Sequence, residues 1–210
     1  MIERRHLREQ VGELIRERIV QQRLPANQSI GEVALAEELG VSRTPVRETL
    51  LGLERDGFVK AVPGRGFVVL PLSAEEARQL YPIVWSLEKL ALDGIESVPT
   101  DTIVRLRAIN AELAEAGTPE ERTRRDGEWH RCLVSIGGNE RLFTLLAGIK
   151  GAIARYEHAF LDLADRRDHS VAEHEAMTRL LETEPARAAE AIEAHWRQGL
   201  AVVLAAIAAR

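Results

Sequence analysis

Apolar residues in the first third of the chain recur first at helical spacing and then in short runs. Helical spacing predicts helices over residues 7–22 and 32–39 and a third helix that begins at Ser42. Two apolar runs, 58–62 and 67–70, flank the turn sequence Pro63-Gly64-Arg65-Gly66 and predict a β-hairpin. With a tight turn at Gly40-Val41, the predicted order is helix, helix, turn, helix and hairpin, which is the order of a winged helix-turn-helix.

The rest of the chain shows helical spacing alone. Ser73 and Glu76 form an S-x-x-E capping box that starts a helix, and Thr118 and Glu121 form another. The apolar pattern predicts helices near residues 74–95, 100–116, 119–136, 140–163, 169–183 and 185–209. With Pro71-Leu72 as a short link, we expect a mainly α protein of two domains. Residues 1–72 would form the winged helix-turn-helix, and residues 73–210 an all-α antiparallel helical bundle.

Charge is distributed unevenly between these two predicted domains. The whole chain has a formal net charge of −5. Residues 1–72 carry 11 basic and 10 acidic side chains, whereas residues 73–210 carry 17 basic and 23 acidic ones. Because the N-terminal surplus is only one positive charge, DNA binding would rely on individually placed arginines rather than on a basic field.

Composition narrows the class of protein further. Apolar residues make up 45% of the chain, enough for a core, and aromatic residues make up only 4%, which disfavours a stacking platform for single-stranded nucleic acid. The longest apolar run, Leu200 to Ala209, is about half of a membrane span. Cys132 has no second cysteine to pair with, so we expect a quiet core thiol in a cytoplasmic protein without membrane contact.

The start of the third predicted helix carries the groups that reading DNA requires. Arg43 and Arg47 are four positions apart and share the face opposite Val46 and Leu50. An arginine fork matches O6 and N7 of guanine in the major groove, and hydroxyls at a helix N-terminus suit phosphate. The predicted DNA-binding residues are Ser42, Arg43, Thr44 and Arg47, with Arg65 and Gly66 of the hairpin. The alternative is a merely solvated helix face.

A second group of polar residues falls on apolar helix faces in the C-terminal part. Asp126 and His130 are four positions apart on one apolar stripe, and His174 and His195 are flanked by apolar residues on later helices. A buried carboxylate is costly without a partner, and a nitrogen and oxygen donor set suits zinc, nickel, manganese or iron. The alternative is an Asp–His pair hydrogen-bonded in the core. Weaker ligand candidates are His158 and His169.

The segment LAEELGVSRTPVRE, residues 35–48, resembles the signature of the GntR family of bacterial regulators. The resemblance extends over about residues 7–70. It implies operator contacts by Ser42, Arg43, Thr44 and Arg47, helped by Arg65 and Gly66 of the wing. Because this family binds short palindromes as dimers, the resemblance also implies a homodimer on double-stranded operator DNA.

The later pattern resembles the FCD effector domain of the FadR-type branch of that family, over about residues 74–205. The resemblance is carried by Asp126-x-x-x-His130, Ser135 to Asn139, Glu173-His174 and Ala194-His195. It implies a divalent metal, zinc first and nickel, manganese or iron as alternatives, at the floor of a cavity. The implied ligands are Asp126, His130, His174 and His195. Open positions on the metal would meet a small-molecule carboxylate effector.

One position departs from that pattern. Many such domains carry an arginine four residues before the glutamate that is Glu88 here, and this chain has Val84 in that place. We therefore predict Arg155 as the cationic contact of the effector, with pairing to Asp162 or Glu157 as the alternative.

These expectations describe a ligand-responsive transcription regulator, a repressor or an activator, in which effector binding alters the bundle and so the DNA-binding heads. A metalloenzyme joined to a DNA-binding head is the alternative. It would need a general base close to the metal, and the nearby candidates Glu128, Glu173 and Glu175 are expected to point away from the ligands. An architectural DNA protein is disfavoured because a structural core has no use for a buried aspartate and three histidines. We predict a regulator rather than an enzyme.

Overall fold

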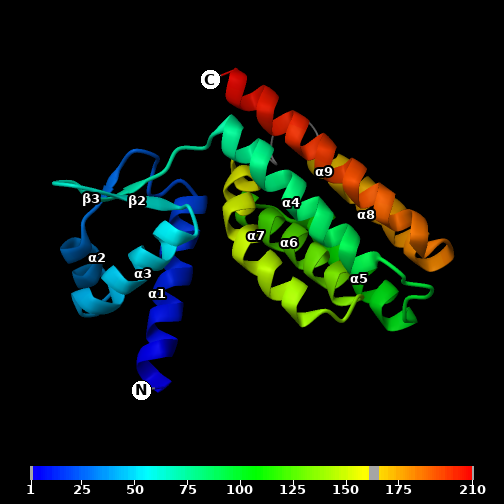
Figure 1. The fold of residues 1–210 in the computed structure, drawn as a ribbon, viewed down its shortest axis with the longest axis horizontal. Helices are drawn as coiled ribbons and strands as arrows, with labels where there is room; N and C mark the ends of the chain where they lie inside the picture. The colour runs from blue at the N-terminus through cyan, green and yellow to red at the C-terminus, as the bar shows by residue number, and fades with distance from the viewer. Residues whose placement is uncertain (1, 161–165, 210) are drawn as a thin grey trace. The chain divides into compact units, whose positions relative to one another are not determined.

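The computed structural model describes residues 2–160 and 166–209, which divide into two compact units between Leu72 and Ser73. The division falls at the end of the link Pro71-Leu72. Helices make up most of both units, with one small sheet near the N-terminus (Figure 1). The predicted mainly α fold is therefore confirmed.

The N-terminal unit combines three helices with an antiparallel sheet. Its elements are α1 (Ile2–Val20), β1 (Ser29–Ile30), α2 (Glu32–Glu38), α3 (Arg43–Arg55), β2 (Val59–Val62) and β3 (Gly66–Val69). The strand order is β1-β3-β2. The hairpin β2–β3 is the predicted wing, whereas β1 was not predicted. Because β1 has only two residues, paired as Ser29 with Val68 and Ile30 with Phe67, it is too short to show an alternating pattern.

The core of this unit fixes which face of α3 meets water. Ile15 of α1, Val46 and Leu50 of α3, and Phe58 are fully buried together. Gly40 adopts a φ of +64° in the turn between α2 and α3, a conformation that glycine reaches at low cost. The turn and the buried apolar face together orient the polar face of α3 outward.

The C-terminal unit is a bundle of helices. They are α4 (Ala74–Leu92), α5 (Thr100–Glu115), α6 (Pro119–Ser135), α7 (Glu140–Phe160), α8 (Arg166–Thr183) and α9 (Pro185–Ala208). The N-cap half of both predicted capping boxes forms, because the amide of Glu76 donates to Ser73 Oγ at 3.4 Å and that of Glu121 to Thr118 Oγ1 at 3.2 Å. The amide of Ser73 donates instead to the Tyr156 hydroxyl, and Oε2 of Glu121 accepts from the amide of Gly117. The prediction extended the α7 helix to residue 163, and residues 161–163 lie outside the described residues.

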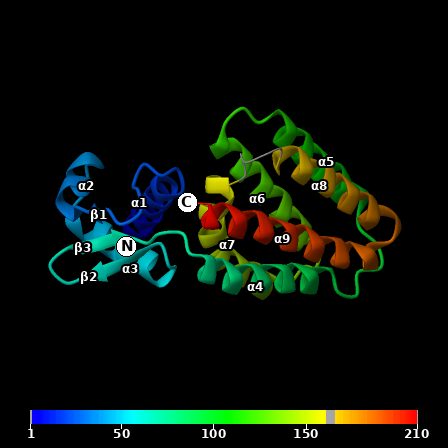
Figure 2. The same cartoon turned by 90° about the horizontal axis from the view of Figure 1, so that it is seen from above.

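The bundle packs consecutive helices together and also brings together helices that are distant in the sequence. Helix α4 packs along α9 and also contacts α7, while α8 packs against α5 and α9 (Figures 1 and 2). Helix α6 contacts α4, α5 and α7. The turn after α6 approaches α4 so closely that a Cβ on Gly137 would lie 2.2 Å from the carbonyl oxygen of Ala91. This packing brings α6, α8 and α9 around one interior site.

Candidate DNA-reading face and metal centre

The first turns of α3 present the predicted DNA-reading side chains to solvent. Ser42 is the N-cap residue, and within the described part of the chain its hydroxyl makes no capping hydrogen bond. Arg43, Thr44 and Arg47 are exposed, whereas Val46 is buried. The polar row therefore faces outward from a helix whose opposite face is fixed in the core.

Arg47 is held by a neighbouring helix. Its Nη1 lies 3.0 Å from Oε1 of Glu32 at the start of α2, and 62% of the Arg47 side chain is exposed. An ion pair so exposed contributes about 0–1 kcal/mol. Glu32 therefore holds the guanidinium of Arg47 in place through a contact that contributes little to stability.

The wing places Arg65 at an exposed turn between two glycines. Gly64 and Gly66 have φ values of +75° and +73°, so both positions favour glycine. Nη2 of Arg65 donates to the carbonyl of Asn27 at 3.2 Å, and Ser29 Oγ donates to the carbonyl of Arg65. These contacts tie the tip of the wing to the segment around β1.

The four predicted metal ligands come together inside the C-terminal unit. His130 on α6, His174 on α8 and His195 on α9 each offer one ring nitrogen, and these three atoms lie within 4.8 Å of one another. Asp126, one turn before His130, places Oδ1 3.7 Å from His174 Nε2 and Oδ2 3.8 Å from His130 Nε2. All four residues are buried.

The chemistry of this cluster fits a divalent cation. Nε2 of His130 is buried and has no hydrogen-bond partner among the described residues. Burial lowers the pKa of His130, with Glu88 opposing that effect, so the imidazole is neutral, which is the form that binds metal. Three imidazole nitrogens and one carboxylate match the preferences of zinc and of nickel, manganese or iron.

Neighbouring groups hold two of the rings in place. The indole of Trp129 stacks on His174 with ring centroids 3.9 Å apart and planes inclined by 1°. Nδ1 of His195 lies 2.7 Å from Oε2 of Glu173. The sequence pattern had placed Glu173 away from the ligand faces. Its carboxylate instead contacts the far nitrogen of a ligand, because α8 and α9 pack side by side.

A buried carboxylate on α4 supports the third ring. Oε2 of Glu88 lies 2.9 Å from His130 Nδ1 and accepts the indole N–H of Trp196 at 2.6 Å. Oε1 lies 2.8 Å from Lys150 Nζ. Burial raises the pKa of Glu88, but its interactions with His130 and Lys150 outweigh that effect and lower the pKa to about 2. Sequence reasoning missed Lys150 and Trp196, since neither belongs to a local motif.

Lys150 also supplies a cation near the position where Val84 replaces the arginine of many similar domains. Val84 is fully buried, and the cation beside Glu88 comes instead from α7 as Lys150. The Lys150 ammonium lies 4.4 Å from the ring centroid of Trp196. A positive charge is therefore present near this part of the bundle despite Val84.

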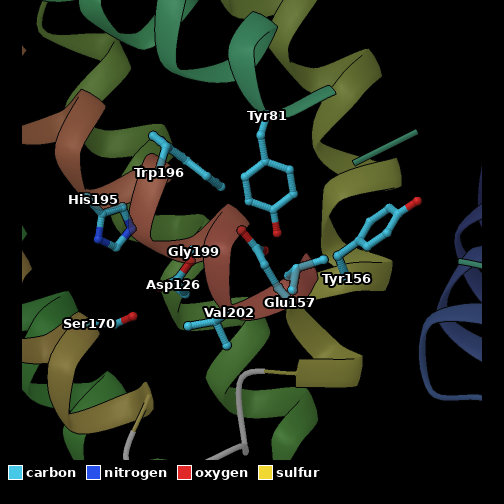
Figure 3. A pocket seen from close by; sticks show the side chains of 10 residues that line it. Tyr81, Asp126, Tyr156, Glu157, Ser170, His195, Trp196, Gly199 and Val202 are labelled. Carbon is cyan, nitrogen blue, oxygen red and sulfur yellow. The ribbon is translucent and has the colours of Figure 1, made fainter. Parts of the chain in front are cut away.

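A small pocket, partly open to solvent, adjoins the cluster. Figure 3 shows Asp126 and His195 on one side of it and Tyr81 and Tyr156 on the other. Trp196 and Val202 complete much of the apolar wall. The pocket thus combines two of the candidate ligands with an aromatic lining, as small-molecule sites commonly do.

Arg155, the predicted effector contact, is not among the residues that line this pocket. Its side chain is buried, and Nη1 lies 3.9 Å from Oε2 of Glu76. Burial lowers its pKa, and Glu76 opposes that effect. The alternative partner Asp162 lies outside the described residues.

The remaining candidates are separate from the cluster. His158 is half-buried and His169 is exposed, and neither belongs to the histidine group. Cys132 is buried, and burial raises the pKa of its thiol, as a quiet core thiol requires. Glu128, weighed as a general base, is engaged by Arg124 at 2.9 Å and Arg125 at 2.7 Å.

Each of the two units matches a known protein family or domain. Residues 7–69 match the sequence profile of the bacterial regulatory proteins of the gntR family, and residues 79–198 match that of the FCD domain. The second match alone covers more than half of the chain.

Curated relatives carry regulator names. The HTH-type transcriptional regulator YdhC of Bacillus subtilis is 33% identical over 129 residues, which are 59% of this chain and 58% of that protein. The Nta operon transcriptional regulator of Aminobacter aminovorans is 35% identical over 127 residues, 59% of this chain and 60% of that protein. The chain thus spans somewhat over half the length of the curated relatives it matches.

Solved structures share the fold. A GntR transcriptional regulator from Rhodococcus sp. RHA1 superposes with a TM-score of 0.82 at 18% identity, covering 96% of this chain and 99% of that one. McbR/YncC of E. coli superposes with a TM-score of 0.82 at 19% identity, covering 96% and 98%. No helix in the described part of the chain is long and apolar enough to cross a bilayer. The chain belongs to the GntR family of bacterial regulatory proteins, a family of transcriptional regulators rather than enzymes, and its C-terminal unit carries an FCD domain.

Proposed function

We propose that this protein is a transcription regulator that binds a palindromic operator as a homodimer and responds to a small carboxylate bound beside a divalent metal. One observation carries the proposal. Asp126 and three histidines from three helices converge beside a pocket, in a chain whose other unit exposes a helix suited to reading DNA.

The DNA-reading role belongs to the exposed start of α3. Arg43 and Arg47 supply guanidinium forks for base edges, while Ser42 and Thr44 lie where phosphate is favoured at a helix N-terminus. The wing adds Arg65. Gly66, which adopts a φ of +73°, starts strand β3 directly after Arg65. Loss of an arginine fork should reduce sequence preference, and loss of a phosphate contact should weaken binding to all sequences.

A homodimer follows from the symmetry of a palindromic operator, because each protomer would read one half-site. The C-terminal unit offers apolar surface for a second copy of the chain. Ile83 and Leu90 are exposed on one stripe of α4, and Phe143 and Leu145 are exposed near the start of α7. Burying these side chains against a second copy would remove them from water. Sedimentation at micromolar concentration tests the dimer.

The sensing role belongs to the cluster and the pocket. Asp126, His130, His174 and His195 would hold the metal, which when bound supplies a positive charge and open positions for an oxygen anion. Tyr81, Tyr156 and Trp196 would hold the remainder of the effector and exclude water. A carboxylate would therefore be recognised by the metal at one side of the pocket and by packing at the other.

Within the C-terminal unit, a side chain of the pocket contacts the first residue after the link, which would let the pocket influence the link. Tyr156 lines the pocket, and its hydroxyl lies 3.1 Å from both the amide and the carbonyl of Ser73, the first residue after the link. A ligand that moves the Tyr156 ring would disturb the start of α4. Arg155 precedes Tyr156 in α7 and is buried beside Glu76 of α4. It would therefore influence the effector response through Glu76 rather than from the pocket wall.

Operator binding with and without effector tests the proposal. Duplexes selected from a random pool would be titrated with metal-loaded protein by fluorescence anisotropy, alone and with individual small carboxylates. We expect at least one carboxylate to change operator affinity about 5–150-fold, the usual range of allosteric coupling, and to do so only with metal bound. Specific DNA binding that no carboxylate alters in loaded protein would contradict the sensing role.

A further inference from the structure

The carboxylate of Glu88 is fully buried and contacts side chains from three other helices. His130 comes from α6, Lys150 from α7 and Trp196 from α9, at 2.9, 2.8 and 2.6 Å. Glu88 itself is on α4 and is 0% exposed. A fully buried charge held by three helices is costly to build, so its arrangement calls for a role beyond packing.

The donors and acceptors around Glu88 determine the proton position on His130. An ammonium and an indole N–H can only donate: the indole of Trp196 donates to Oε2 of this carboxylate, and the ammonium of Lys150 lies 2.8 Å from Oε1. An ionised carboxylate can only accept, so Nδ1 of His130 must carry the hydrogen that it shares with Oε2. A neutral imidazole with a proton on Nδ1 has its lone pair on Nε2. That atom faces Asp126 at 3.8 Å, on the side of the cluster.

We propose that Glu88 is a positioning residue that fixes the Nδ1–H tautomer of His130 and turns its Nε2 lone pair toward the centre of the cluster. Lys150 neutralises the charge of the carboxylate, and Trp196 fixes the position of Oε2. The consequence for metal affinity rests on the metal site proposed above, whereas the tautomer is a property of the metal-free chain.

Glu173 and His195 form a second pair in which a glutamate carboxylate lies beside Nδ1 of a histidine of the cluster. His195 Nδ1 lies 2.7 Å from Glu173 Oε2, but the Glu173 side chain is 23% exposed. Water can therefore reach that carboxylate and share in its hydrogen bonding. Glu88 is enclosed, so water does not compete for the hydrogen that its carboxylate shares with Nδ1 of His130.

Replacing Glu88 by glutamine tests the role, because an amide has only one oxygen. If that oxygen faces Lys150, the amide N–H₂ faces His130 Nδ1, which must then accept, and the proton moves to Nε2. If the oxygen faces His130 and Trp196, the N–H₂ faces the ammonium of Lys150. The first arrangement moves the proton to Nε2 and sets the amide N–H₂ against the indole N–H of Trp196, whereas the second keeps the proton on Nδ1 and sets the N–H₂ against the charged ammonium of Lys150. Because a clash with a charged donor costs more, we expect the first arrangement.

The first measurement is ¹⁵N NMR of histidine-labelled, chelator-treated protein. In the wild type we expect His130 to show protonated Nδ1 and unprotonated Nε2, and in E88Q the reverse. Lys150→Met should keep the wild-type tautomer, because Glu88 still accepts from His130 and Trp196. A wild-type His130 with the proton on Nε2 would overturn the proposal, and that result needs no variant to fold.

The second measurement is zinc affinity by competition with a chromophoric chelator. Outer partners of metal-bound histidines commonly contribute 10–100-fold, so we expect a loss of about that size in E88Q. The matched control is E193Q, which alters the half-buried ion pair of Lys89 with Glu193 on α9 and should leave affinity unchanged. If the wild type binds no zinc but shows the expected tautomer, the metal site fails and the Glu88 assignment stands. Folded E88Q with the wild-type tautomer and affinity would refute the assignment.

Discussion

The hydroxyl of Tyr156 lies 3.1 Å from the amide nitrogen of Ser73, which joins a residue of the pocket to the first residue of the C-terminal unit. The same hydroxyl donates to the carboxylate of Glu76 in the first turn of α4. A side chain placed between a ligand site and a link is suited to carrying a change in one to the other.

Tyr156→Phe should separate effector binding from its consequence. The variant keeps the aromatic wall of the pocket but loses the contacts with Ser73 and Glu76. We expect operator affinity in the absence of effector and metal content to stay as in the wild type, and the effector-induced change in operator affinity to fall several-fold. Anisotropy titrations measure both. Tyr81→Phe is the control, since it likewise removes a hydroxyl from the pocket lining while Tyr156 keeps its contacts with Ser73. An equal loss in both variants would assign the effect to the pocket alone.

Arg47→Ala should weaken specific operator binding by about 1–3 kcal/mol, through loss of a bidentate base contact. Its pair with Glu32 is exposed, so the free energy of unfolding should change by less than about 1 kcal/mol. Arg55→Ala removes the same charge from the other end of α3 and should have a smaller effect on specificity. Unchanged discrimination between operator and random duplex in the Arg47 variant would remove Arg47 from the reading face.

Gly137→Ala should destabilise the C-terminal unit. The new Cβ would lie 2.2 Å from the carbonyl oxygen of Ala91, and backbone on both sides must move to admit it. Overpacking of this kind costs about 1–3 kcal/mol. Gly148→Ala is the matched control, because nothing lies within 4 Å of its Cβ and alanine should stabilise the α7 helix by about 0.5–1 kcal/mol. Thermal unfolding compares them, and equal stability of the two variants would contradict the close approach.

Local patterns predicted much of this chain. The N-cap bonds of Ser73 and Thr118 form because cap and partner are three residues apart and need no distant group. The i, i+4 spacing of Asp126 and His130 on an apolar stripe was enough to predict that both would be buried. These features depend on one helix at a time, so the sequence alone can reveal them.

Features that depend on several helices were not predictable in the same way. Lys150 and Trp196 meet Glu88 only because α7 and α9 both pack against α4, and neither residue stands out in its own helix. Glu173 was expected to point away from the ligands, yet it contacts His195 across two helices. The strand β1 was missed because two residues give no period.

Cys132 should resist alkylation in the native state. Its side chain is buried, and burial raises the pKa of the thiol, so little of the reactive thiolate is present at neutral pH. We expect iodoacetamide to label the native protein much more slowly than protein unfolded in denaturant, as measured by mass spectrometry. Labelling at equal rates would show that the thiol is accessible and would revive a redox role.

The central claim is that Asp126, His130, His174 and His195 hold a divalent metal, and metal analysis of purified protein tests it most directly. Wild type would be compared with Asp126→Ala/His174→Ala and with Asp168→Ala/His169→Ala, a matched pair of exposed residues at the start of α8. We predict about one metal per chain in the wild type and in the exposed pair, and little in the buried pair. Wild-type protein that takes up no zinc, nickel, manganese or iron would contradict the claim, as would a buried-pair variant that keeps full occupancy.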